Sequence, residues 1–81
     1  MKKFAHPDMQ RYVYYIRETL NGHAIQVLNV DRDERYPLTK TIAAQNDLTV
    51  PEGIVFNASS LETVEASLLA LATANDMIEI E

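Results

Sequence analysis

Three absences narrow the kinds of protein that this chain can be. It has no cysteine, which excludes a disulfide framework and thiol chemistry and suits a reducing compartment. Its two glycines form no phosphate-binding loop. No apolar run reaches the length of a membrane span, and no apolar signal segment follows the basic start Met-Lys-Lys. We therefore expect a cytoplasmic protein without a membrane partner.

The fourth absence is positive charge in the second half of the chain. All seven Lys and Arg lie within residues 1–40 with five carboxylates, a balance of +2, whereas residues 41–81 hold seven carboxylates and no base, a balance of −7. Solvated surfaces usually mix both signs. A surface of one sign repels nucleic acid and attracts basic proteins, so we expect a protein partner and no direct contact with nucleic acid.

The size and composition of the chain fit one small acidic domain. A chain of 81 residues buries about 60–65% of its unfolded surface, enough for one core. An apolar fraction of 47% with 23% charged residues is typical of globular proteins and not of disordered ones. No repeat or linker divides the sequence, so residues 1–81 are predicted to form a single α+β domain.

The clearest predicted element is a helix over residues 60–74. Apolar side chains recur there at helical spacing, and no glycine or proline interrupts them. The stretch Ser59-Ser60-Leu61-Glu62 matches a capping box with Ser59 as the cap. Asn75 is expected to end the helix in the left-handed conformation.

Short strands are predicted on both sides of this helix. Residues 53–57 are β-branched and aromatic and follow a turn signal. Residues 77–81 alternate with period two, so Ile78 and Ile80 should face the core while Met77, Glu79 and Glu81 face solvent.

The N-terminal half favours a β-hairpin. Residues 12–20 and 23–30 are rich in β-forming side chains and flank Asn21-Gly22, the preferred pair of a two-residue type I′ turn. This turn would place Ile16 opposite Val27 and leave apolar groups on both faces, so we expect a bulge near Val27 or a longer loop. A helix over residues 9–20 is the alternative, because Met9, Val13, Ile16 and Leu20 also keep helical spacing.

Residues 36–43 fit either a third strand or, after Pro37, a short helix, with the strand favoured. The expected fold is an antiparallel sheet of three to five strands, beginning with an N-terminal hairpin or meander. One long helix packs on one face, and the order is roughly β-β-β-β-α-β.

No residue pattern predicts a catalytic, cofactor or metal site. His6 and His23 lack companions at ligand spacing. The pair Asp31-x-Asp33 begins like a calcium loop, but Arg35 and Tyr36 occupy positions that need an oxygen ligand and a glycine. We therefore expect a protein that is not an enzyme and holds neither cofactor nor metal.

Tyrosines and carboxylates are the candidate contact residues. Tyr12 and Tyr14 share one strand face, and Tyr15 lies on the other. These tyrosines fit three roles: part of the core, a protein contact or, together with Arg11 and Arg17, a surface that stacks bases. The helix dipole and the protection of an edge strand explain some of the carboxylates. Neither effect explains why residues 41–81 contain no Lys or Arg. The predicted partner-binding residues are Glu62, Glu65, Asp76, Glu79, Glu81, Tyr12 and Tyr14.

The sequence therefore predicts a binding protein whose acidic C-terminal half docks on a basic protein and blocks or modulates it. A nucleic-acid-binding complex is one source of such a basic surface. Small phage-encoded inhibitors of host defence, such as anti-CRISPR and anti-restriction proteins, often have this size and charge, although no motif marks such a family here. The alternative is a structural or assembly subunit that forms a homo-oligomer through sheet edges and a tyrosine-rich face.

Overall fold

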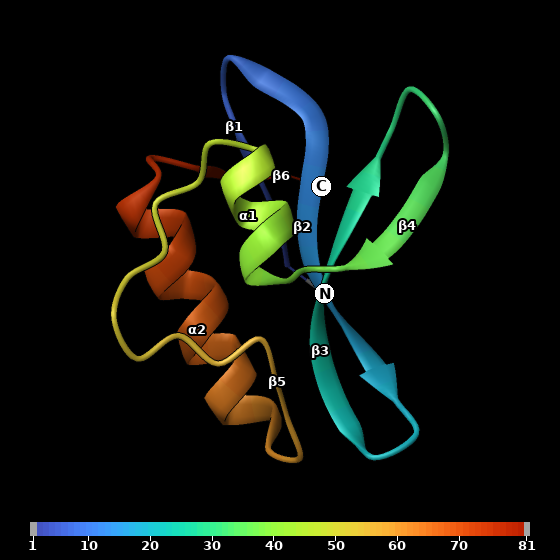
Figure 1. Cartoon of the computed structure of the whole chain (residues 1–81), viewed down its shortest axis with the longest axis vertical. Helices are drawn as coiled ribbons and strands as arrows, with labels where there is room; N and C mark the ends of the chain where they lie inside the picture. The colour runs from blue at the N-terminus through green and yellow to red at the C-terminus, as the bar shows by residue number, and fades with distance from the viewer. Residues whose placement is uncertain (1, 81) are drawn as a thin grey trace.

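Residues 2–80 are described by a computed structural model, in which strands precede and follow two helices (Figure 1). The elements are β1 (Lys3–His6), β2 (Met9–Thr19), β3 (Gly22–Asn29), β4 (Glu34–Pro37), α1 (Lys40–Gln45), β5 (Asn57–Ala58), α2 (Leu61–Ala74) and β6 (Ile78–Ile80). The six strands form one antiparallel sheet in the order β4-β3-β2-β1-β6, and β5 pairs with β3. The predicted α+β class and element order are confirmed, with one strand more than expected and α1 inserted before β5.

Both helices lie on one side of the sheet and cover the core (Figure 1). Alternation along β2 and β3 turns Tyr14, Ile16, Ile25 and Val27 toward the helices, where Leu71 is fully buried among them. The core also contains Phe4, Leu38, Ala43, Val64, Leu68 and Ala72. No element among residues 2–80 covers the opposite side, which we call the open face (Figure 1). No helix in this part of the chain is long and apolar enough to cross a membrane.

The predicted hairpin is confirmed, but its turn lies one residue earlier than the Asn-Gly signal indicates. Thr19 pairs with Gly22 and Ile16 with Ile25, so the two turn residues are Leu20 and Asn21. This register places the apolar pairs on the core face without a bulge and with a two-residue turn, so the expectation of a bulge near Val27 or a longer loop was wrong. The helical alternative for residues 9–20 was wrong as well, because β2 occupies them.

A close approach from a distant segment explains the position of Gly22. Its φ is +155°, and a Cβ built there would lie 2.4 Å from the carbonyl oxygen of Ala58 in β5. Only glycine fits this place, so Gly22 belongs to the paired strand rather than to the turn.

The helix predicted over residues 60–74 is confirmed as α2, with different caps. Ser60, not Ser59, is the N-cap, and its hydroxyl accepts a hydrogen bond from the amide of Thr63. Asn75 is the C-cap with a φ of −113°, and the left-handed residue is Asp76 at a φ of 54°. The preference for a strand over residues 36–43 was wrong beyond Pro37, because Thr39 caps α1, which begins at Lys40.

Two predictions about the strands also need correction. The predicted strand over residues 53–57 is reduced to β5, and the unpredicted β1 lies between β2 and β6. Pairing with β1 sets the faces of β6, because Glu79 pairs with the core residue Phe4 and Ile80 with Lys3. Ile78 and Ile80 therefore point to the open face, and Ile78 is 44% exposed. Met77 packs against the core instead.

Candidate functional site

The two helices end with the same dipeptide, Asn-Asp. Asn46 caps α1 and Asp47 follows with a φ of 58°, while Asn75 caps α2 and Asp76 follows with a φ of 54°. A left-handed residue after the cap is a common way to end a helix, usually with glycine or asparagine. Aspartate is unfavourable at both places, because its charge has the same sign as the helix C-terminus.

Hydrogen bonds from the two capping asparagines hold the helix ends in place. The Asn75 amide accepts a hydrogen bond from the Thr49 N–H and donates one to the Thr49 carbonyl, each at 2.7 Å. It donates another to the carbonyl of Leu71 at 2.8 Å. The Asn46 amide donates to the hydroxyl of Tyr14 at 3.1 Å. The end of α2 is thus fixed to the loop after α1, and the end of α1 to the sheet.

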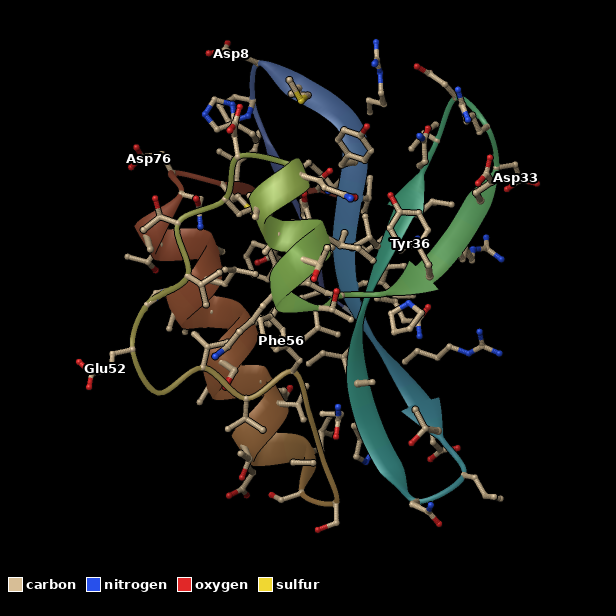
Figure 2. The ribbon with its side chains drawn as sticks, viewed as in Figure 1. Asp8, Asp33, Tyr36, Glu52, Phe56 and Asp76 are labelled. Carbon is tan, nitrogen blue, oxygen red and sulfur yellow. The ribbon has the colours of Figure 1, made fainter. Side chains whose placement is uncertain are left out.

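A cleft of about 410 Å³ lies between these helix ends and the β1–β2 turn. Asp8 from the turn, Asp47 and Asp76 contribute its carboxylates, and we call it the acidic cleft. Figure 2 shows Asp8 and Asp76 projecting from the same end of the molecule, whereas Asp33 lies on the far side. Within residues 2–80, no group of three or more His, Asp or Glu side chains has the spacing of a metal site.

The wall opposite the helix ends is aromatic and apolar. Met9, Tyr12 and Tyr14 of β2 line it, and Tyr14 is only 3% exposed. Met77 adds apolar surface beside the end of α2. Burial raises the pKa of Tyr14, although the hydrogen bond from Asn46 acts in the other direction. The hydroxyl therefore remains protonated at neutral pH. The cleft combines negative charge at its rim with aromatic surface inside.

No ion pair to these carboxylates is found in the described part of the chain. The ion pairs found within residues 2–80 join Arg11 to Asp31 at 3.0 Å and Arg32 to Glu34 at 3.8 Å. Both pairs lie in or beside the β3–β4 turn, and Arg11, which shares a hollow with Asp8, is already paired with Asp31. The acidic cleft therefore carries three carboxylates beside two helix C-termini, and the imidazole of His6 also lines it.

The structure brings three of the predicted contact residues together and separates the others. Tyr12, Tyr14 and Asp76 line the acidic cleft. Glu62 and Glu65 are exposed near the start of α2, at the other end of that helix, and Glu79 is exposed on β6. Glu81 lies outside the described residues.

Sequence reasoning did not identify Asp8 and Asp47 as part of the site. The signal for Asp47 was present as the repeated dipeptide Asn46-Asp47 and Asn75-Asp76. Asp8 gave no signal, because it joins the cleft only through the β1–β2 turn.

The molecule carries the opposite charge on its open face. Lys3, Arg17 and Arg35 surround Tyr15 and Leu28 there, lining a hollow of about 400 Å³. Several nitrogen-tipped side chains project from the side of the sheet away from α2 (Figure 2). The charge asymmetry between the two halves of the sequence thus becomes an asymmetry between two surfaces of the fold.

Comparison with protein-family models, with curated proteins and with solved structures gave no match.

Proposed function

We propose that this protein is a non-enzymatic binding protein whose acidic cleft receives a lysine or arginine side chain from a basic protein surface. Docking of this kind covers the basic surface and blocks or modulates its use, for example its contact with nucleic acid. A cytoplasmic inhibitor of the anti-restriction or anti-CRISPR type would act in this way. The observation that carries the proposal is that Asp8, Asp47 and Asp76 line one cleft, while no ion pair found among residues 2–80 involves them.

The positions of two of these aspartates support a role beyond stability. Asp47 and Asp76 occupy left-handed positions at helix C-termini, where a neutral asparagine would avoid repulsion by the helix dipole. Each charge costs about 0.3–1 kcal/mol at such a place. Binding sites commonly retain residues that reduce stability, because function requires them.

The chemistry of the wall fits a cationic side chain better than a simple ion. A guanidinium or ammonium group at the cleft would lie beside the half-buried ring of Tyr12, and a tyrosine ring attracts cations with about 0.5–2 kcal/mol. Tyrosine with arginine is also a frequent pair at the centre of protein interfaces. The hydrogen bonds of Asn46 and Asn75 fix the walls before binding, which lowers the entropy cost of docking.

A peptide titration tests this proposal. An arginine- and lysine-rich peptide is added to the labelled protein, and amide chemical shifts are followed at low and high salt. Shifts should concentrate at Asn46, Thr49 and Asn75, and the affinity should fall steeply as salt increases.

The matched variants are Asp47→Asn with Asp76→Asn, and Glu62→Gln with Glu65→Gln, which remove equal charge. The first pair should weaken binding at least tenfold, and the second should have little effect. Equal weakening by both pairs, or shifts centred on the start of α2, would overturn the assignment to the acidic cleft.

A further inference from the structure

The open face is a basic surface built by strand alternation. Side chains at alternate positions of β2 share one face, so Tyr15 and Arg17 point away from the buried Tyr14 and Ile16. Cross-strand pairing places Lys3 of β1 beside Tyr15, and Arg35 of β4 beside Leu28 of β3. Three cations from three strands therefore surround one aromatic and apolar centre.

Carboxylates of the same strands point the other way. Glu18 shares the face of Ile16, and Glu34 shares the face of Tyr36, which packs against the core. Arg11 also belongs to the open face by alternation, but it pairs with Asp31 at 3.0 Å. No such pair within residues 2–80 involves Lys3, Arg17 or Arg35. The basic surface is thus as uncompensated as the acidic cleft.

Apolar groups extend this surface toward the β6 edge. Ile80 lies beside Lys3 in the next strand, and Ile78 is 44% exposed in the same row of side chains. Tyr15 and Leu28 are half-buried between the cations. An apolar centre with a charged rim is the usual composition of a protein-binding surface.

We propose that the open face binds the acidic cleft of a second copy of this chain, so that molecules associate head to tail. The occupant follows from charge complementarity, because the acidic cleft is the surface of opposite sign that every copy supplies. A symmetric contact between two open faces is disfavoured, because it would oppose three cations with the same three cations.

The size of the molecule sets the expected strength of this contact. Its principal extents are 31 × 26 × 25 Å, so only a whole face approaches the ~800 Å² per partner of a standard stable interface. Association should therefore be weak and sensitive to salt. A heterologous contact of this kind does not close on itself by symmetry and can extend to more than two copies.

Self-association uses the same cleft as the proposed docking on a basic protein. A basic partner and a second copy therefore compete, and binding of the partner should dissolve the assemblies. This consequence depends on the proposed function, whereas the head-to-tail contact itself does not.

Sedimentation of two complementary variants tests the contact. Variant A carries Asp47→Asn and Asp76→Asn, and variant B carries Lys3→Gln, Arg17→Gln and Arg35→Gln. The native protein should exceed its monomer mass of 9.2 kDa at high concentration and low salt and return to it at high salt. Variants A and B should each remain monomeric. A mixture should form a 1:1 dimer that does not grow, because A retains the basic face and B the acidic cleft.

Three results would overturn the proposal: a native protein that stays monomeric at low salt, association of A or B alone, or a mixture that stays monomeric while the native protein associates. Circular dichroism of A and B confirms that both fold, and Glu62→Gln with Glu65→Gln controls for lost charge. Peptide binding by the native protein without self-association would reject this contact and leave the proposed function intact. Self-association without peptide binding would reject the proposed function and leave this contact intact.

Discussion

Asn75 and Thr49 exchange two hydrogen bonds of 2.7 Å, one in each direction, across 26 positions of sequence. The side chain of Asn75 thereby replaces a backbone partner for Thr49 and joins the loop after α1 to the end of α2. A third bond, to the Leu71 carbonyl, holds the same amide against the last turn of α2. One side chain therefore fixes the spacing between the two helix ends that form the acidic cleft.

Replacing Asn75 with alanine should lower the free energy of unfolding by about 1–3 kcal/mol. Three hydrogen bonds are lost, each with a net value of about 0.5–1.5 kcal/mol, and such losses are not additive. Urea unfolding measures the change. Asn46→Ala is the matched comparison at the other helix end and should cost less, because its side chain makes one such bond, to Tyr14. A larger loss at Asn46 would contradict this account of the cleft.

Replacing Asp47 or Asp76 with asparagine should stabilise the protein by about 0.3–1 kcal/mol each, because repulsion by the helix C-terminus disappears and asparagine accepts the left-handed conformation. For a domain of this size, 1 kcal/mol corresponds to about 4–8 °C in Tm. Thermal unfolding at low salt measures the effect.

Asp33 provides the control, since its φ is 52° but it belongs to a strand turn. Asp33→Asn should give no stabilisation. An equal gain at all three aspartates would show that backbone conformation, and not the helix dipole, is responsible.

Replacing Gly22 with alanine should cost more than about 2 kcal/mol. The new Cβ would lie 2.4 Å from the Ala58 carbonyl oxygen and 2.6 Å from the Ser59 Cα, so β5 or the hairpin has to move. Gly53→Ala is the control, because its φ is +87° with no atom within 4 Å of the added Cβ. Gly53→Ala should cost only the strain of the left-handed region, about 1 kcal/mol. Chemical denaturation of both variants would reveal similar losses if contact with β5 were unimportant.

The stability of the protein should decline at alkaline pH because of Tyr14. Burial raises the pKa of Tyr14, so the unfolded chain loses this proton first, near pH 10, and the native state retains it longer. The native state binds more protons between the two pKa values, and stability is complete below about pH 10 and falls above it.

Tyr14→Phe should flatten this alkaline decline in unfolding experiments between about pH 9 and 12. Burial also raises the pKa of Tyr36, which is half-buried, so Tyr36→Phe should remove a smaller part. An unchanged alkaline decline in the Tyr14 variant would refute the assignment.

The elements with strong local signals were predictable from the sequence. The stripe of Val64, Leu68 and Leu71 with a serine cap predicts α2, because periodicity and capping are properties of neighbouring residues. The β-branched and aromatic residues around Asn21 predict the β2–β3 hairpin in the same way.

Features that depend on distant partners were not predictable. The hairpin register depends on the approach of Ala58 to Gly22, and the faces of β6 depend on pairing with β1. Asp47 and Asp76 share a cleft only because Asn75 holds Thr49. None of these relationships leaves a pattern within one segment. The sequence therefore indicates the negative charge of the acidic cleft but not its place in the fold.

The pairing of β1 with β6 has a consequence for how the chain folds during synthesis. Lys3 and Ala5 pair with Ile80 and Ile78, so β1 gains its outer neighbour only after residue 80 has left the ribosome. The β2–β3 hairpin is local and can form earlier, while closing the sheet at β6 requires a loop of nearly the whole chain. Until then β1 is an unpaired edge, the place where a nascent chain is most exposed to pairing with the wrong strand.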